Sequence, residues 1–430
     1  MAAGMVEAPP SRLLRVATAG SVDDGKSTLI GRLLFDAKAV LTDQLAAVED
    51  ASRRRGYDDA DLALLVDGLR AEREQGITID VAYRYFATPR RSFVLADTPG
   101  HVQYTRNMVT GASTADVAVV LVDARAGLVE QSRRHATIAG LLGVGHLVLA
   151  VNKMDLVDWS ADVFDAILRD FAALAADRGI RSWSAVPLSA LLGDNVVTAS
   201  ARTPWYAGPP LLELLETLDP PSTDDPELGW RFPVQLVVRP RTVSHPDYRG
   251  YAGRVAAGAV RVGDAVRVLP GGATSAVAGI DTYDEPLDEA PAGRSVVIRL
   301  GDDLDVSRGD LLVGAGREPS VTRDVTATVC WLSADPLLPG SRWRVRQATR
   351  DVRAVVAEVL DVLDVTTGVG GPAGSLVLND IGTVRIRTAE PLVVDLYAAG
   401  RRTGGLLVVD ELTGSTAGAG MVLDGRCPAG

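Results

Sequence analysis

The stretch Gly20-Ser21-Val22-Asp23-Asp24-Gly25-Lys26-Ser27 fits the pattern G-x-x-x-x-G-K-[ST] and follows an apolar run, residues 13–19, that is typical of a buried strand. In this pattern small residues let backbone N–H groups wrap a phosphate at the start of a helix, which we expect over residues 27–35. Lys26 is then placed to reach the β- and γ-phosphates of a nucleotide, and the Ser27 hydroxyl to hold Mg²⁺. The stretch predicts a phosphate-binding loop that runs on to Thr28 in the first helical turn.

Lysine is rare in this chain, and its positions support the loop. Of the 44 basic residues 41 are arginine, and lysine occurs only at positions 26, 38 and 153. Lys26 has to act as a compact charge among phosphates, a role that the guanidinium fork of arginine fits poorly. Lys153 falls in a second nucleotide motif. The alternative explanation is a general bias toward arginine, with a few lysines left by chance. This explanation applies to Lys38, which lies outside any motif.

Length and composition set the class of protein. The chain has 430 residues, 47% of them apolar, and a net charge of −11, which indicates two or three packed domains. The acidic balance and the lack of a basic tail disfavour a nucleic-acid partner. Two cysteines are too few for a disulfide framework, and residues 1–11 lack the apolar core of a signal peptide. With no apolar run of membrane-spanning length, we expect a soluble, cytoplasmic protein without membrane association.

Residues 13–218 alternate apolar runs with helical patterns, which predicts a six-stranded parallel sheet covered on both faces. The predicted strands are residues 13–19, 81–86, 93–96, 117–122, 146–151 and 184–188. A long polar segment, residues 36–80, separates the first helix from the second strand. A connection of this length inside a compact domain is usually functional or mobile.

Two motifs beside the second and third strands predict the γ-phosphate end of the site. Thr78 ends the long polar segment, where its hydroxyl can join Mg²⁺ and order the segment only while a γ-phosphate is present; an ordinary strand threonine is the alternative. The string Asp97-Thr98-Pro99-Gly100-His101 follows the strand at 93–96. We expect Asp97 near Mg²⁺, the Gly100 N–H on the γ-phosphate and His101 beside the attacking water. The alternative for His101 is a surface-loop histidine.

The string Asn152-Lys153-Met154-Asp155 follows the strand at 146–151 and predicts base recognition. A carboxylate at Asp155 accepts from both the N1–H and the exocyclic amino group of guanine, a donor pair that adenine lacks. Ser189 and Ala190 follow the next strand, where we expect a backbone N–H to reach the guanine carbonyl. These motifs favour GTP as the nucleotide.

The composition and the residue pattern of the sequence change after residue 218. Proline-rich passages at 204–210 and 220–226 enclose a short helix and predict a linker at 219–229. Short β runs separated by Gly and Asp turns then predict two antiparallel β-barrels, at 230–320 and 321–430. The expected fold is an α/β P-loop GTPase domain at 13–218, after a disordered N-terminus at 1–12, followed by two β-barrel domains. The second half has no cluster of His, Cys or paired carboxylates, so we expect it to serve interaction and support.

The nucleotide motifs, in this order and on these predicted elements, resemble the translation-factor class of GTPases. More specific strings resemble the large GTPase subunit (subunit 1) of bacterial sulfate adenylyltransferase over nearly the whole chain. They are Asp24, where elongation factors typically carry histidine, and residues 61–69, 71–85, 88–91, 104–108, 193–197, 245–250 and 379–382. The chain departs from that family at Val102, where an acid is usual, and in the glycine-rich residues 368–374.

The resemblance implies a GTP-hydrolysing regulatory subunit of sulfate adenylyltransferase (ATP sulfurylase). Its GTP hydrolysis would drive a partner, the small catalytic subunit of the heteromer, to form adenosine 5′-phosphosulfate and pyrophosphate from ATP and sulfate. The implied cofactors are GTP and Mg²⁺. The implied catalytic residues are Lys26, Thr78 and His101, and the implied Mg²⁺ ligands are Ser27, Thr78 and Asp97. The resemblance also implies that Asn152, Lys153 and Asp155 recognise the guanine base.

The resemblance leaves other functional assignments open. Some relatives append an adenylylsulfate kinase domain, and because this sequence stops at Gly430 we expect that second activity to be absent. The second candidate function is that of a translation-elongation-type GTPase, which delivers an aminoacylated RNA. A paralogue that serves sulfation in secondary metabolism is a third possibility.

Overall fold

A computed structural model of the chain describes residues 13–37, 62, 81–101, 105–220, 225–240, 247–283, 285–314, 316–364 and 367–425. The chain divides into two compact units, Met1–Pro221 with Val365–Gly368, and Ser222–Asp364 with Val369–Gly430. The sequence predictions that lie outside the described residues include the disordered N-terminus at 1–12, the Thr78 hydroxyl, and all of the string at 61–69 except residue 62. They also include most of the polar segment at 36–80, residues 71–80, 104 and 245–246 of the other strings, Val102, and residues 221–224 of the linker. Among the helices of the described ranges, none has both the length and the apolar composition needed to cross a lipid bilayer.

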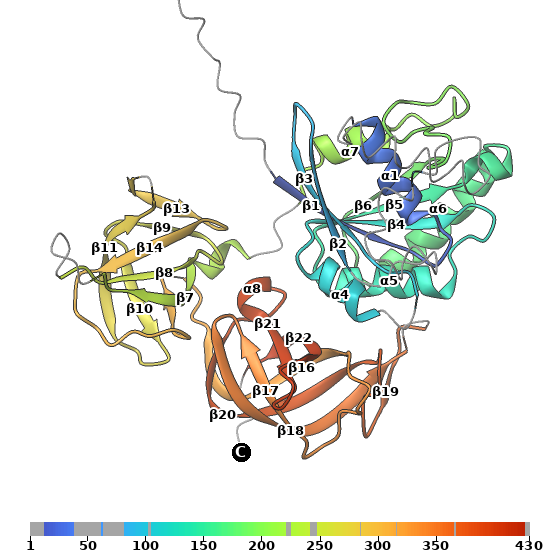
Figure 1. Ribbon diagram of the computed structural model, residues 1–430. Helices are drawn as coiled ribbons and strands as arrows, with labels where there is room; N and C mark the ends of the chain where they lie inside the picture. Colours follow the sequence, from blue (N-terminus) through green and yellow to red (C-terminus); the bar gives the residue numbers. More distant parts are fainter. Residues whose placement is uncertain are drawn as a thin grey trace, which may run out of the picture. The chain divides into compact units, whose positions relative to one another are not determined.

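The first unit is a six-stranded sheet in the order β2-β3-β1-β4-β5-β6 with helices on both faces (Figure 1). Its strands are β1 (Leu13–Ala19), β2 (Ala82–Ala87), β3 (Ser92–Asp97), β4 (Val117–Asp123), β5 (His146–Asn152) and β6 (Trp183–Pro187). Its helices are α1 (Lys26–Asp36), α4 (Thr105–Ser113), α5 (Glu130–Leu141), the 3-10 turn η3 (Met154–Val157), α6 (Ala161–Asp177) and α7 (Leu211–Thr217).

One strand departs from the predicted parallel sheet. β2 pairs with β3 in the antiparallel direction, whereas β1, β3, β4, β5 and β6 run parallel. Only residues 88–91 join β2 to β3, and the Thr88 N–H donates to the Arg91 carbonyl at 2.8 Å to close the turn. A parallel connection needs a crossover of a dozen or more residues, so a turn this short makes β2 an antiparallel edge strand.

The alternation of side chains along β1 decides which helices cover each face of the sheet. Leu14 and Val16 share one apolar cluster with residues of α1 and α7, whereas Ala17 packs on the other face with Ala115, which lies between α4 and β4. Figure 1 shows α1 and α7 on one side of the sheet and α4 and α5 on the other. The central strands β4 and β5 are buried at every residue, as expected of parallel strands covered on both sides.

Polar residues end three neighbouring strands of this sheet. Asp97 ends β3, Asp123 ends β4 and Asn152 ends β5. Because these strands are parallel, all three side chains lie at the same edge of the sheet, where open α/β sheets bind their ligands. This edge carries the candidate site.

The second unit holds two antiparallel barrels, each with its own apolar core. In the first barrel the sheet order β10-β15-β7-β8-β14-β11-β12 is closed by pairing of β10 with β11, and β9 pairs with β13 separately. The short turn η4 (Pro226–Leu228) precedes it. Its strands are β7 (Arg231–Val238), β8 (Gly250–Arg254), β9 (Ala259–Arg261), β10 (Ala265–Leu269), β11 (Thr274–Asp281), β12 (Pro286–Leu287), β13 (Glu289–Pro291), β14 (Ser295–Leu300) and β15 (Leu311–Val313).

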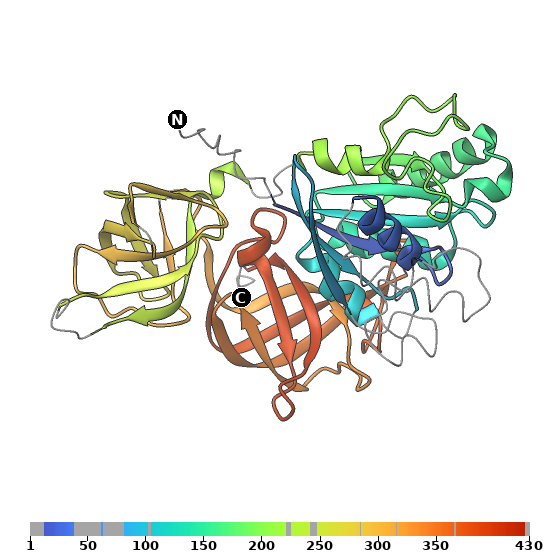
Figure 2. The ribbon, with the colours of Figure 1, turned by 45° about the horizontal axis from the view of Figure 1, so that its top comes forward.

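The second barrel has the order β17-β21-β22-β16-β20-β18-β19 and is closed by pairing of β17 with β18. Figure 2 shows its strands, orange to red, curling around a common core. They are β16 (Ser320–Trp331), β17 (Arg342–Gln347), β18 (Arg350–Leu363), β19 (Gly370–Pro372), β20 (Ile381–Val394), β21 (Gly405–Val409) and β22 (Thr416–Asp424), with the short helix α8 (Arg401–Gly404) between β20 and β21.

A buried ion pair joins the two barrels within the second unit. Arg231, at the start of β7, is fully buried, and its Nε and Nη2 donate to the Asp395 carboxylate at 3.0 and 3.1 Å. The Thr403 hydroxyl donates to the same carboxylate at 2.6 Å. Because neither charge reaches water, removal of one partner would leave the other buried and uncompensated.

Candidate guanine nucleotide site

The predicted phosphate loop connects β1 to α1, and its glycines stand where a side chain does not fit. A Cβ at Gly20 would lie 2.7 Å from the Leu121 carbonyl oxygen, and one at Gly25 would lie 2.5 Å from the Asn152 side-chain nitrogen. Both glycines also have positive φ, +143° and +89°. The main chain therefore approaches its neighbours closely here, and α1 begins at Lys26 with its first N–H groups beside the loop.

The Lys26 ammonium lies inside the loop. Its Nζ donates to the Gly20 carbonyl at 3.2 Å and to the Ser21 carbonyl at 2.7 Å, and only 7% of the residue is exposed. Burial lowers the pKa of Lys26, and the nearby carboxylates of Asp97 and Asp24 oppose that shift. A Cβ at Gly100 would lie 2.3 Å from the same Nζ. Two motifs far apart in the sequence therefore meet at this ammonium group.

The residues predicted near Mg²⁺ are only partly described. Asp97 is 1% exposed, and the Thr18 hydroxyl donates to its Oδ1 at 3.3 Å. Ser27 stands in the first turn of α1, and Thr78 lies outside the described residues. His101 is half-buried, after the buried residues 98–100.

Asn152 links the base-recognition motif to the phosphate loop. Its Nδ2 donates to the Asp24 carbonyl at 2.8 Å, and its Oδ1 accepts from the Ala190 N–H at 2.9 Å. The Ala190 N–H, predicted to reach guanine, is thus engaged by Asn152. Met154 is fully buried, whereas Asp155 is half-buried and its carboxylate accepts no hydrogen bond from any described residue. Its two oxygens can therefore accept a donor pair from a ligand.

Lys153 bridges the same loop to the end of β4. Its Nζ donates to the Asp23 carbonyl and lies 2.9 Å from Asp123 Oδ2. Arg125 donates to both Asp123 oxygens, at 3.0 and 2.6 Å, and these bonds, with Lys153, hold the pKa of Asp123 well below its usual range. Asp123 and Arg125 were not among the site residues predicted from the sequence. The available signal was the place of Asp123 at the end of a buried strand, beside the ends of β3 and β5.

The residues at this edge suit a guanine nucleotide with Mg²⁺. The glycines allow close approach of a phosphate, Lys26 supplies a buried cation, and Ser27 and Asp97 offer the oxygen ligands that Mg²⁺ prefers. Across the described part of the chain, no group of three or more His, Cys, Asp or Glu could hold a metal ion by itself. A single carboxylate with hydroxyl partners fits Mg²⁺, which usually keeps several waters and binds through substrate phosphates.

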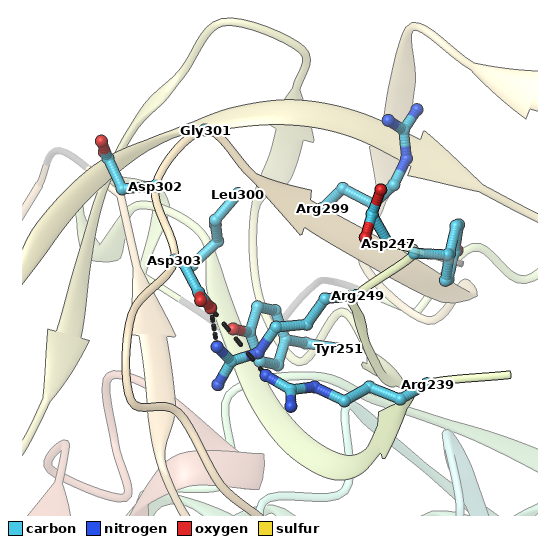
Figure 3. Close-up of a pocket in the computed structure, with 10 residues that line it drawn as sticks. Arg239, Asp247, Arg249, Tyr251, Arg299, Leu300, Gly301, Asp302 and Asp303 are labelled. Atoms are coloured by element: carbon cyan, nitrogen blue, oxygen red, sulfur yellow. Dashed lines mark hydrogen bonds and ion pairs between the residues drawn. The ribbon is translucent and has the colours of Figure 1, made fainter. Parts of the chain in front are cut away.

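The string that precedes β8, singled out from the sequence, leads to a separate pocket in the first barrel of the second unit. The pocket has a volume of about 550 Å³ and opens between the ends of β7, β8 and β14. Arg249 and Arg239 both approach the Asp303 carboxylate (Figure 3). Arg299 donates to the Asp281 carboxylate at 2.8 Å. These guanidinium groups are paired with carboxylates of the same barrel, so the pocket is no simple anion site.

Comparison with known families agrees with this geometry. Residues 11–221 match the family described as the elongation factor Tu GTP binding domain, and residues 324–423 match the family described as GTP-eEF1A C-terminal domain-like. The fold and the site therefore define a GTPase of the translation-factor class, with the predicted GTPase domain and β-barrels in the predicted order.

Curated relatives identify the particular family. The chain is 50% identical over 423 residues to sulfate adenylyltransferase subunit 1 of Citrobacter koseri, covering 98% of this chain and 88% of that protein. It is 55% identical over 413 residues to the bifunctional enzyme CysN/CysC of Mycobacterium tuberculosis, covering 96% of this chain and 67% of that protein. The chain belongs to the sulfate adenylyltransferase subunit 1 family, which confirms the resemblance drawn from its sequence strings.

A third relative shows how much of the longer proteins the chain represents. The bifunctional enzyme NodQ of a Rhizobium strain is 50% identical over 426 residues, which cover 98% of this chain and 66% of that protein. The chain thus spans about two thirds of the length of its bifunctional relatives.

Proposed function

We propose that this chain binds and hydrolyses GTP, and that this hydrolysis drives a partner small subunit to form adenosine 5′-phosphosulfate and pyrophosphate from ATP and sulfate. The observation that carries the proposal is the convergence of the loop, Lys26, Gly100 and Asn152 at one sheet edge, in a chain of the sulfate adenylyltransferase subunit 1 family. The family favours this function over delivery of an aminoacylated RNA.

The phosphate end of the site supplies charge and orientation. Hydrolysis attaches a water oxygen to the γ-phosphorus and breaks its bond to the β–γ bridging oxygen, so negative charge grows on the phosphate oxygens. Lys26 and the N–H groups at the start of α1 are placed to stabilise that charge. Ser27, Thr78 and Asp97 would hold Mg²⁺, which when bound neutralises charge on the β- and γ-phosphates. His101 orients the attacking water.

The base end supplies specificity. Asp155 accepts from the guanine N1–H and amino group, while Asn152 holds the adjoining loops in place through Asp24 and Ala190. The Lys153 ammonium is fixed between Asp23 and Asp123, and we assign Lys153 to guanine recognition together with Asp155.

The division of labour follows from the sequence. Only Lys26 among the three lysines is preceded by glycine, so the chain has a single G-x-x-x-x-G-K-[ST] loop. One such loop and one guanine-reading motif account for one nucleotide site. We therefore assign ATP and sulfate to the partner subunit.

The assay uses the purified chain with GTP, Mg²⁺, ATP and labelled sulfate, with and without the small subunit encoded by the same organism. We expect slow GTP hydrolysis and no adenosine 5′-phosphosulfate from the chain alone. Addition of the small subunit should yield that product and accelerate GTP hydrolysis, because a partner that binds one loop state better shifts the chain toward it. Product from the lone chain would overturn the division of labour. Stimulation by ribosomes but not by the small subunit would support the elongation-type function instead.

A further inference from the structure

A layer of polar side chains from α5 lies directly behind the phosphate loop. His135 and Ser132 are both fully buried, although neither belongs to a nucleotide motif. His135 Nδ1 accepts a hydrogen bond from the Gly20 N–H at 3.0 Å, and the Gln131 amide nitrogen, Nε2, lies 2.8 Å from His135 Nε2. Both nitrogens of this imidazole therefore have defined partners.

These contacts decide the protonation of the ring. Nδ1 can accept from Gly20 only if it carries no proton, so the neutral ring bears its hydrogen on Nε2. The Gln131 amide must then be turned over, so that its oxygen rather than its nitrogen faces His135 Nε2 and accepts that hydrogen. Burial lowers the pKa of His135 to about 3, and the nearby Lys26 ammonium contributes to the shift. The imidazole is therefore neutral at physiological pH, and its Nδ1 lone pair is permanently available to the loop.

Gly20, the first residue of the loop, is held through both of its flanking peptide groups. The Gly20 N–H points to His135, whereas the Gly20 carbonyl accepts from Lys26 Nζ at 3.2 Å. A shift of Gly20 would therefore also move the Lys26 ammonium, the main cation of the site. Gly20 has no side chain with which to resist such a shift, and its φ of +143° lies in a region that only glycine adopts readily.

Ser132 supports the same loop at Asp24, the residue directly before its second glycine. The Ser132 hydroxyl lies 3.4 Å from Asp24 Oδ2, a carboxylate oxygen that also accepts from the Ser21 N–H. Asp24 is 5% exposed, and its burial raises its pKa while the Ser21 N–H opposes the shift. The loop is thus anchored to α5 at both of its turns before any phosphate contact is made.

We propose that His135 is a positioning residue of the nucleotide site, whose Nδ1 lone pair holds Gly20 and hence Lys26 in the phosphate-binding arrangement. This inference rests on the proposed function, since it concerns the site that binds GTP. Groups that are held in place before the ligand arrives cost no reorganisation on binding. Loss of the Nδ1 acceptor should therefore reduce nucleotide affinity.

Two isosteric substitutions separate this role from simple packing. An asparagine amide oxygen overlaps the place of histidine Nδ1, whereas a glutamine amide reaches the place of Nε2. His135→Asn thus keeps the acceptor for Gly20, and His135→Gln removes it. His146→Gln is the matched control, because His146 is also buried, bonds to Ser182 at 2.7 Å and Ser184 at 2.9 Å, and lies at the start of β5, away from the loop.

The measurements are the dissociation constant for a fluorescent guanine nucleotide in the presence of Mg²⁺ and the midpoint of thermal unfolding. We expect His135→Gln to weaken nucleotide binding about tenfold, the value of one hydrogen bond, and His135→Asn to stay within about threefold of the unsubstituted chain. His146→Gln should lower the unfolding midpoint but leave the dissociation constant unchanged.

The outcomes separate this inference from the proposed function. Equal affinity in the two His135 variants, whether unchanged or equally weakened, would overturn the positioning role. If His135→Gln is too unstable to measure, recovery of affinity in His135→Asn relative to His135→Ala takes its place, and failure of asparagine to recover affinity overturns the inference. A chain with native His135 that binds no guanine nucleotide would instead refute the proposed function.

Discussion

The side-chain amide of Asn152 donates a 2.8 Å hydrogen bond to the main-chain carbonyl of Asp24, 128 residues earlier in the chain. The same amide accepts from the Ala190 N–H at 2.9 Å. One buried side chain therefore ties together three loops that meet at the carboxyl edge of the sheet. In the proposed function, base recognition and phosphate binding would therefore depend on each other.

Asn152→Ala should weaken both the fold and the site. It leaves the Asp24 carbonyl and the Ala190 N–H without their partner, so we expect a loss of about 1–3 kcal/mol in unfolding free energy and at least a tenfold loss of GTP affinity. Gln347→Ala is the control, because Gln347 is 4% exposed and donates to the Thr403 carbonyl at 2.7 Å in the second unit. Urea unfolding and nucleotide titration of both variants check the prediction. A loss of GTP affinity in the Gln347 variant would show that destabilisation alone accounts for the effect.

Asp155→Asn should exchange nucleotide specificity. The amide donates where the xanthine ring offers an oxygen, so the variant should lose GTP by about 10⁴-fold or more and gain xanthosine triphosphate. Asp158→Asn provides the comparison, since Asp158 is exposed and only three residues away. Competition titrations with the two triphosphates measure the switch. Unchanged GTP affinity in the Asp155 variant would place base recognition elsewhere.

His101→Ala and Lys26→Ala should affect different steps. Orientation of water matters in the transition state, so the His101 variant should bind GTP normally but turn it over at least about tenfold more slowly. Lys26 is buried inside the loop, so its removal should weaken binding itself. Equilibrium titration and single-turnover hydrolysis separate the two effects. Equal losses of affinity in both variants would make His101 a structural residue.

Asp395→Ala should destabilise the second unit strongly. The buried Arg231 guanidinium would lose its counter-charge, at a cost of about 3–5 kcal/mol. Asp324→Ala is the matched change in a surface pair, because its partner Arg387 has a side chain 70% exposed, and it should cost no more than about 1 kcal/mol. Denaturant unfolding of each variant gives the comparison. A similarly small loss of unfolding free energy in both variants would mean that the buried pair contributes little to the stability of the barrels.

The protonation of His135 predicts a pH dependence of stability. Its pKa falls from 6.5 to about 3 on folding, so between these values the unfolded chain binds a proton that the folded chain does not. The unfolding free energy should therefore decrease as pH falls below about 6.5, with a slope of about 1.4 kcal/mol per pH unit from this group. Asparagine does not titrate, so the difference between the native chain and His135→Asn should decline from about pH 6 to pH 4 and stay flat above pH 7. A difference that does not change with pH would show that the pKa of His135 is the same in the folded and unfolded chains.

Local pattern alone was enough to predict the main elements. The glycines and Lys26 specify a loop that leads into α1, and runs such as those of β4 and β5 are apolar at nearly every residue because both faces of a central parallel strand are covered. The short β runs with Gly and Asp turns likewise predict the barrels of the second half. These signals lie within windows of a few residues, so no knowledge of distant contacts is needed to find them.

The tertiary structure decided what depends on residues far apart in sequence. His135 and Gly20 are 115 residues apart, and Arg231 and Asp395 are 164 apart. Of these four residues only Gly20 belongs to a motif. The contact of Asp123 with Lys153 and the pairings that close each barrel likewise join distant parts of the chain. The sequence determined which residues form the phosphate loop and the elements around it. Only the tertiary structure decided which buried polar groups lie behind that loop. A hydrogen-bond partner depends on proximity in space, and such a pair produces no periodic pattern in the sequence.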